Sequence, residues 1–278
     1  GMDYLPDKIT PYRLGWNSVA ANISDIDAMG GEPTWTFVSI GFRPDTEVAF
    51  VEELYRGMVE CARRFGSTVA GGDTNSVRGD GTVSITQLGR VERDRIVTRS
   101  GARVGDRLLV TGRLGDSRGG LELLLRFGLE EAERTSKSLI DAHLSPMPRV
   151  PEARAAASTG LVRAMMDLSD GLGSDLPKLC RASGVGAVVR ASLLPIGDDL
   201  LRISEMLGLD ALELAAGGGE EFELLMVVDA EGVDTVIGAI ETTGTPVTEI
   251  GEITRDRVEI ELAGGGVKPL SGGWEHFH

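Results

Sequence analysis

Residues 162–172 read Val-Arg-Ala-Met-Met-Asp-Leu-Ser-Asp-Gly-Leu, an apolar run that leads through an acidic turn toward leucines at helical spacing. The run predicts a strand from Val162 to Met166, and the leucines after the turn predict a helix from Gly171 to Ala182. Asp167 then stands at the end of a strand, where open α/β folds commonly bind their ligands. Asp170 could instead serve only as the N-cap of the helix. The stretch predicts an α/β fold with a candidate ligand site at this turn.

Other acidic turns stand far away along the chain, each beside glycine or serine. They are Ser24-Asp25, Gly71-Gly72-Asp73 and Gly218-Gly219-Glu220-Glu221. Carboxylates in tight turns that glycine permits supply the hard oxygen ligands that Mg²⁺ prefers. Several such turns from distant parts of one chain favour a site for more than one ion, and this chemistry usually accompanies phosphate. Each turn taken alone could also be an ordinary loop or a helix cap.

The composition narrows the class of protein. The chain has 278 residues, 41% of them hydrophobic, with 28 Lys and Arg against 43 Asp and Glu, which gives a net charge of −15. This charge argues against nucleic acid or an anionic membrane as the main partner, and a phosphate substrate would need metal ions as its counter-charge. No apolar run reaches transmembrane length and no signal peptide is visible at the start, so we expect a cytoplasmic protein. Cys61 and Cys180 are expected to be reduced core thiols.

The rest of the chain alternates helices and strands in two halves. In the first half the pattern predicts helices from Gly15 to Met29 and from Asp45, as N-cap, to Phe65, and strands at 68–70 and 83–91. Near residue 100 the pattern resets, and we place the boundary there between an N-terminal domain, 1–100, and a C-terminal domain, 101–278. The second half predicts strands near 107–111, 162–166, 187–191, 221–228 and 258–262, and helices near 121–125, 152–158, 171–182 and 233–242. The sequence thus predicts a two-domain α/β (α+β) fold.

A glycine-rich loop from Gly112 to Gly120 precedes the helix near residues 121–125. Backbone N–H groups at the start of a helix attract anions, so a phosphate cradle is one interpretation. The loop matches neither the G-x-x-x-x-G-K-[ST] nor the G-x-G-x-x-G pattern. The alternative that we prefer is a turn in which Asp116 or Ser117 caps the helix.

Taken in order along the chain, these motifs resemble the thiamine-monophosphate kinase family, within the superfamily that includes aminoimidazole ribonucleotide synthetase. The resemblance covers nearly the whole chain, and the combination of motifs is more specific than any one of them. It rests on Asn22-Ile-Ser-Asp-Ile-Asp-Ala-Met-Gly30, Gly71-Gly-Asp-Thr74, Thr98-Arg-Ser-Gly-Ala102, Gly105-Asp106, Val110-Thr-Gly112, Asp167-Leu-Ser-Asp-Gly-Leu172, Gly218-Gly-Glu-Glu-Phe-Glu-Leu-Leu225 and the closing Gly273-Trp-Glu-His-Phe277.

The resemblance implies ATP-dependent phosphorylation of thiamine monophosphate to thiamine diphosphate. It also implies two α/β domains, a homodimer paired through the N-terminal domains, and ATP bound near that interface. The residues that match the family's metal ligands, for several Mg²⁺ ions, are Asp25, Asp73, Asp167 and Asp170. Those that match its ATP contacts are Tyr55, Gly72, Asp73, Arg99 and Ser169, and those that match its thiamine contacts are Glu220 and Trp274. No general base is expected, because the attacking phosphate oxygen is already ionised at neutral pH.

The sequence departs from the family pattern in two places. Where the family has Gly-Gly-Glu-Asp-Tyr-Glu-Leu, this chain has Glu221 in place of the shorter acid and Phe222 in place of the tyrosine. The family also has an upstream segment with an Asp-Asp pair, a further metal-binding aspartate and a histidine near the substrate. We expect that this segment has been left out ahead of the present chain; the alternative is a truncated protein that lacks part of the metal site. The alternatives are another ATP-using member of the superfamily, such as the aminoimidazole ribonucleotide, selenophosphate or hydrogenase-maturation type, or a non-catalytic protein that binds nucleotide or metal.

Overall fold

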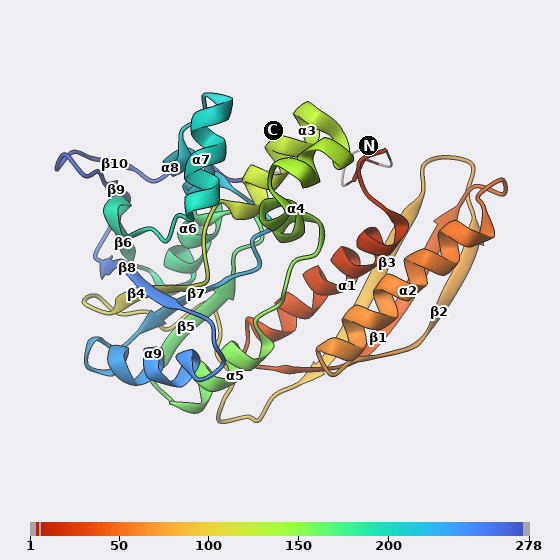
Figure 1. The fold of residues 1–278 in the computed structure, drawn as a ribbon. Helices are drawn as coiled ribbons and strands as arrows, with labels where there is room; N and C mark the ends of the chain where they lie inside the picture. Colours follow the sequence, from red (N-terminus) through yellow and green to blue (C-terminus); the bar gives the residue numbers. More distant parts are fainter. Residues whose placement is uncertain (1–3, 6, 275–278) are drawn as a thin grey trace.

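A computed structural model describes residues 4–5 and 7–274, and the strands within them form two sheets (Figure 1). The smaller sheet contains β1 (Glu32–Phe42), β2 (Thr68–Ser76) and β3 (Thr82–Arg90), in the order β2-β1-β3. The larger sheet contains β4 (Arg107–Thr111), β5 (Val162–Asp167), β6 (Gly186–Arg190), β7 (Leu224–Val228), β8 (Val247–Thr254), β9 (Val258–Glu261) and β10 (Val267–Pro269). Its order is β10-β9-β6-β8-β4-β7-β5. We propose that the domain boundary lies between β3 and β4.

Helices α1 (Pro11–Asp27) and α2 (Val48–Arg64) cover one face of the smaller sheet (Figure 1). Val38 and Ile40 of β1 point into the core that these helices share. The two helices cross with their backbones in contact, because a Cβ atom at Gly15 would lie 2.0 Å from the carbonyl oxygen of Leu54. On the opposite face of β1, Trp35 is 51% exposed and Phe37 is 39% exposed.

Both faces of the larger sheet are covered. The five residues of β7 are all buried, and they alternate between two cores. Leu225 and Val227 belong to the core with α6 (Leu172–Ser183) and α8 (Ala211–Gly217), whereas Met226 belongs to the core with α5 (Val150–Ser158) and α9 (Val233–Glu241). A strand buried on both faces reads as a continuous apolar run, as this one does. Helices α3 (Asp116–Thr135), α4 (Lys137–Leu144) and α7 (Asp198–Leu207) form a further apolar cluster beyond the sheet.

Several predicted elements are confirmed, including β4, β5, α6 and α9, and Cys61 and Cys180 are free and buried. The prediction of Asp45 as the N-cap of α2 is wrong: the cap position is Glu47, and the Asp45 carboxylate accepts a hydrogen bond from Arg43. β2 continues to Ser76, so the Gly71-Gly72-Asp73 turn is in fact strand. Elements that the sequence pattern did not predict are β1, α4, α7, α8, β8 and β10.

Two further expectations concern membranes and the chain end. None of the helices that the structure describes is both long enough and apolar enough to cross a membrane. The end of the closing Gly273-Trp-Glu-His-Phe277 motif, after Trp274, lies outside the described residues.

The backbone contact between α1 and α2 predicts that replacing a glycine by alanine inside this contact and replacing one outside it change the free energy of unfolding in opposite directions. Gly57→Ala places a methyl group where the Tyr12 carbonyl oxygen is only 1.9 Å from the ideal Cβ position, and we expect overpacking to lower the free energy of unfolding by roughly 1–3 kcal/mol. Gly238 in α9 has nothing within 4 Å of its ideal Cβ, so Gly238→Ala should raise that free energy by about 0.5–1 kcal/mol. Urea unfolding followed by circular dichroism measures both. Equal changes in the two variants would contradict the backbone contact.

Candidate active site

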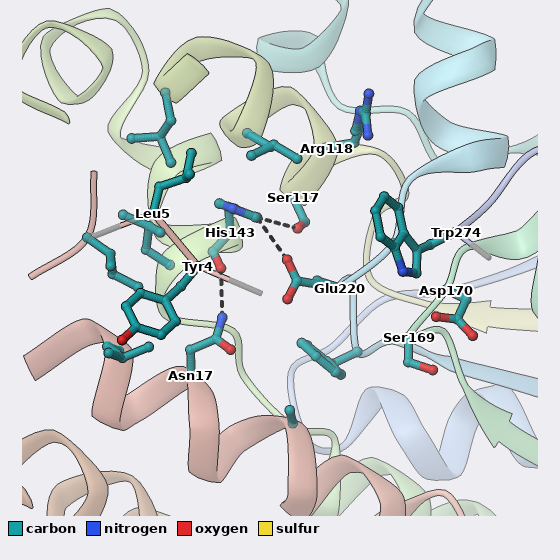
Figure 2. Close-up of a pocket in the computed structure, with 18 of the residues that line it drawn as sticks. Tyr4, Leu5, Asn17, Ser117, Arg118, His143, Ser169, Asp170, Glu220 and Trp274 are labelled. Carbon is teal, nitrogen blue, oxygen red and sulfur yellow. Dashed lines mark hydrogen bonds and ion pairs between the residues drawn. The ribbon is translucent and has the colours of Figure 1, made fainter. Parts of the chain in front are cut away.

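A cavity of about 620 Å³ opens where α1, α3 and α4 meet the turn after β5 (Figure 2). Its volume suits a small organic ligand. One part of the wall is apolar, with leucines from α3 and α4, and the rest is polar. The cavity gathers Asp25, Asp167, Ser169, Asp170, Glu220 and Trp274. These six residues are predicted site residues from four separate segments of the sequence.

The turn after β5 is hydrogen-bonded to two other segments that line the cavity. All four bonds run between backbone atoms: Leu168 N to Glu223 O at 2.9 Å, Phe222 N to Leu168 O at 2.9 Å, Glu220 N to Ser169 O at 2.8 Å and Trp274 N to Asp170 O at 2.9 Å. Because backbone bonds do not depend on rotamers, they fix Glu220 and Trp274 relative to the carboxylates of the turn. The site is therefore assembled by main-chain pairing.

The loop that carries Glu220 has an unusual backbone. Glu220 has φ 60° and Phe222 has φ 51°, and these are the non-glycine residues with positive φ among those described. This left-handed region costs energy for residues with a side chain and persists where the surroundings determine it. The Phe222 ring is 4% exposed, so burial of the ring and pairing with the turn together hold the loop. Phe222 thus has a packing role that needs no hydroxyl group.

Asp167 ends β5, as predicted, and is only 2% exposed. Its Oδ2 atom accepts a hydrogen bond from Ser24 Oγ of α1 at 2.8 Å. Burial raises the pKa of Asp167 to about 6, the Ser24 hydrogen bond opposes this, and the charge of Asp25 adds to it. Burial also raises the pKa of Asp25, and Arg99 opposes that rise. Asp25, Asp167 and Arg99 therefore lie in one electrostatic neighbourhood.

The donor set around Asp25 and Asp167 fits Mg²⁺ when phosphate is present. Mg²⁺ is usually bound by one or two carboxylates together with substrate phosphates and water. Among residues 4–5 and 7–274, no group of three or more Asp, Glu, His or Cys residues is arranged to hold an ion. A metal at these two carboxylates would need phosphate oxygens or water to complete its coordination.

Asp170 has a different neighbour from the one that the sequence suggested. The N-cap of α6 is Gly171, so the interpretation of Asp170 as the helix cap is wrong. Its carboxylate instead accepts a hydrogen bond from Lys178 Nζ at 2.5 Å, and the same ammonium group donates to Asp175 Oδ1 at 2.8 Å. Asp175 Oδ2 accepts from the Asp170 backbone amide at 2.9 Å. Lys178 and Asp175 were not predicted, and together they brace the turn.

Four predicted residues do not line the cavity: Tyr55, Gly72, Asp73 and Arg99. Asp73 sits within β2, where its carboxylate accepts from Thr74 N at 2.9 Å and from Asn75 Nδ2 at 2.7 Å. A Cβ at Gly72 would lie 1.7 Å from the Val38 carbonyl oxygen, so the close pairing of β2 with β1 already requires glycine there. Tyr55 packs against the core of the smaller sheet. Their assignment to ATP and metal stays a prediction.

Glu221 caps the N-terminus of α3 from a distant loop. Its Oε1 atom accepts from Gly115 N at 3.0 Å and its Oε2 atom accepts from Ser117 N at 3.3 Å. Burial raises the pKa of Glu221 well above its usual value, and these amides oppose the rise. The N-cap position is Gly115, so the prediction of Asp116 or Ser117 as the cap is wrong. Since Glu221 occupies these amides, the loop does not offer them to a phosphate.

Comparison with known proteins first defines the class. Residues 2–91 match the family described as AIR synthase related protein, N-terminal domain, and residues 103–263 match AIR synthase related protein, C-terminal domain. Thiamine-monophosphate kinase of Aquifex aeolicus (strain VF5) is 34% identical over 277 residues, which span 100% of this chain and 85% of that relative. The enzyme of that name from Escherichia coli (strain K12) is 36% identical over 257 residues, 92% of this chain and 76% of the relative. The chain belongs to the thiamine-monophosphate kinase family of AIR synthase related proteins.

Solved structures agree with this placement. The crystal structure of thiamine monophosphate kinase from Aquifex aeolicus has a TM-score of 0.84 and 34% identity, covering 97% of this chain and 86% of that one. AaThiL complexed with AMPPCP and TMP has a TM-score of 0.83 at 34% identity, covering 96% of this chain and 81% of that one. A hydrogenase maturation protein, HypE, has a TM-score of 0.79 at 22% identity, with 95% and 84% coverage. That last likeness concerns the fold alone.

The buried Asp167 carboxylate predicts a distinctive pH dependence of stability. Its pKa of about 6 in the folded protein exceeds the value of about 3.9 in the unfolded chain. The folded state therefore binds this proton more tightly, and the stability that the proton contributes is lost as pH rises from about 4 to about 6. Asp167→Asn removes this loss and can still accept the Ser24 hydrogen bond. In EDTA we expect the variant to exceed the wild type at pH 7.5 by on the order of 2 kcal/mol.

Urea unfolding at pH 4, 5, 6 and 7.5 measures this difference. Asp45→Asn is a matched control, because Arg43 lowers the pKa of that exposed carboxyl. Its removal should change stability in the opposite direction at neutral pH, and only slightly. If the stability of Asp167→Asn changed with pH in parallel with that of the wild type, burial would not raise the pKa of this carboxyl group.

Proposed function

We propose that this chain transfers the γ-phosphoryl group of ATP to the phosphate of thiamine monophosphate and so forms thiamine diphosphate. The observation that carries the proposal is the arrangement of one cavity, which has Asp25 and Asp167 in its lining together with Glu220 and Trp274. Thiamine monophosphate is a phosphate ester of a cationic ring system. Its phosphate end matches a metal site at Asp25 and Asp167, and its cationic ring matches Glu220 and Trp274. The relatives named thiamine-monophosphate kinase, and the relative complexed with AMPPCP and TMP, support this choice of substrates.

The organic end of the substrate would lie between Glu220 and Trp274. The Trp274 indole is 57% exposed and lines the cavity, so it offers a face on which a planar cationic ring can stack. The Glu220 carboxylate supplies the opposite charge. The phosphate end would then reach toward Asp25 and Asp167.

The carboxylates at the phosphate end would hold Mg²⁺. Mg²⁺ bound there would supply charge neutralisation and in-line alignment for the two phosphate groups. Asp167 would be ionised at neutral pH, since its pKa is about 6, and Ser24 would keep it oriented toward the cavity. No side chain needs to remove a proton, because the attacking oxygen is already ionised.

The open face of the smaller sheet supports a homodimer. Trp35, which is 51% exposed, pairs across the sheet with Leu88, which is 47% exposed. Phe37 lies on the same face and is 39% exposed. Soluble monomers rarely leave such a contiguous apolar face uncovered. Asp73 pairs with Ser39 in register and so shares this face. We propose that the partner covers the face and that ATP binds near it, which would bring Gly72 and Asp73 into the working site.

The activity is tested by incubating the protein with ATP, Mg²⁺ and thiamine monophosphate and measuring thiamine diphosphate. We expect product from the wild type, and a fall in kcat of roughly two orders of magnitude or more in Asp167→Asn and in Asp73→Asn. Asp45→Asn is the control, because Asp45 pairs with Arg43 on the surface, and it should retain wild-type rates.

Three outcomes would contradict the proposal in whole or in part. Wild-type rates in both Asp167→Asn and Asp73→Asn would remove these carboxylates from the mechanism. Absence of product from the wild type, together with turnover of a purine-pathway or selenide substrate, would assign the chain to another activity of the superfamily. Binding of ATP without turnover of any of these substrates would favour the non-catalytic alternative.

The dimer has its own test. Phe37→Asp places a charge in the apolar face, and we expect it to convert a dimeric wild type into a monomer in sedimentation velocity at micromolar concentration. Val48→Asp is the matched control, because Val48 is 72% exposed on α2, and it should leave the dimer intact. A monomeric wild type, or a dimeric Phe37→Asp variant, would rule out this interface.

A further inference from the structure

A histidine that no motif singled out lies against Glu220 in the cavity wall. His143 belongs to α4, and its Nδ1 atom is 3.5 Å from Glu220 Oε2 and 3.1 Å from Ser117 Oγ of α3 (Figure 2). The imidazole is 12% exposed and the Glu220 side chain is 45% exposed. The histidine therefore forms the inner wall and the carboxylate faces the cavity in front of it.

These three side chains do not form a hydrolytic triad. A triad histidine uses one ring nitrogen for the serine and the other for the acid. Here Ser117 and Glu220 both approach Nδ1, and Ser117 is 0% exposed. A buried hydroxyl cannot attack a ligand in the cavity. The cluster is built to hold a group rather than to react.

The position of His143 is fixed by helix packing. The His143 carbonyl oxygen accepts a hydrogen bond from Asn17 Nδ2 of α1 at 3.1 Å. A Cβ at Gly120 would lie 2.1 Å from the Leu139 carbonyl oxygen and 3.0 Å from the Cβ of His143. Helices α3 and α4 thus meet in backbone contact beside the histidine. The imidazole is a rigid support for whatever it contacts.

The imidazole is also uncharged. Burial, together with a smaller effect of the Arg118 charge, lowers the pKa of His143 to about 4. A neutral imidazole in contact with a carboxylate can orient it without cancelling its charge, whereas a lysine or arginine in this place would neutralise it. Arg118 itself pairs with Glu122 at 2.9 Å.

The backbone and the carboxylate of Glu220 are contacted by different segments. The backbone has φ 60° in a loop outside regular secondary structure, and its amide is held by Ser169 O at 2.8 Å. The carboxylate is contacted by His143 of α4, 3.5 Å away. A contact at the end of a glutamate side chain limits the torsions of that side chain.

We propose that His143 is a positioning residue that holds the Glu220 carboxylate toward the cationic ring system of the substrate. The inference rests on the proposed function, because it assumes that thiamine monophosphate occupies this cavity. It assigns to His143 a role in binding the organic end of the substrate and none in phosphoryl transfer.

Steady-state kinetics of the full chain distinguishes an effect on the binding of thiamine monophosphate from an effect on the binding of ATP. His143→Leu should raise KM for thiamine monophosphate by roughly tenfold, because it removes the polar contact to the Glu220 carboxylate, while KM for ATP changes little. His143→Asn can place an amide nitrogen near the former Nδ1 position and should restore most of the affinity. His143→Gln reaches instead to the Nε2 position and should not. This pair keeps a polar group in the wall, so it also tests the proposal if His143→Leu folds poorly.

A double-mutant cycle with Glu220→Ala identifies the route of the effect. If His143 acts by holding Glu220, His143→Leu should raise KM in the wild type and change it little in the Glu220→Ala background. Lys137→Ala, at a residue of α4 whose side chain is 71% exposed, should behave as wild type in both. Equal increases in both backgrounds, or equal KM values in the Asn and Gln variants, would overturn the proposal.

The wild type serves as the reference for the proposed function. If it does not form thiamine diphosphate at all, the proposed function fails and the cause is not His143. If it forms product and His143→Leu keeps the wild-type KM for thiamine monophosphate, only the role of His143 is rejected.

Discussion

Pairing of the backbone around residues 168–170 is the constraint on which the site depends. This short turn bonds to the loop of Glu220 on one side and to Trp274 on the other, with four N–H to carbonyl bonds of 2.8–2.9 Å. The turn itself is positioned by β5, a buried strand of the larger sheet. Because main-chain bonds transmit position without rotamer freedom, residues about 50 and 100 positions further along the chain come to fixed places beside Asp167. Substrate contacts and phosphate-side carboxylates are therefore one structural unit.

The second constraint is charge. The cavity brings together Asp25, which is exposed, and Asp167, which is buried, and desolvation at this site raises the pKa of both carboxyls. Buried carboxylates without full compensation are costly and mark sites where a cation completes the arrangement. At the organic end, the neutral His143 leaves Glu220 with its charge. The two ends thus favour cations of different kinds, a hard metal ion with phosphate and a planar organic cation.

The sequence predicted the parts of the fold that rest on local patterns. Asp167 was placed correctly because an apolar run ends at it. β1 was not predicted, since Trp35 and Phe37 on its open face remove the alternation that marks a half-buried strand. The cap of α3 was predicted wrongly because Glu221 stands 106 positions from Gly115. His143 carried no local signal at all, since its contact with Ser117 joins residues 26 positions apart on two helices.

The most direct test of the account is a crystal structure of this chain with Mn²⁺ in place of Mg²⁺, a non-hydrolysable ATP analogue and thiamine monophosphate. The anomalous signal of Mn²⁺ locates the metal independently of the protein coordinates. The account predicts an anomalous peak bonded to the carboxylates of Asp25 and Asp167, with the thiamine ring between Glu220 and Trp274. A metal bound away from both carboxylates, or a thiamine ring outside this cavity, would contradict it.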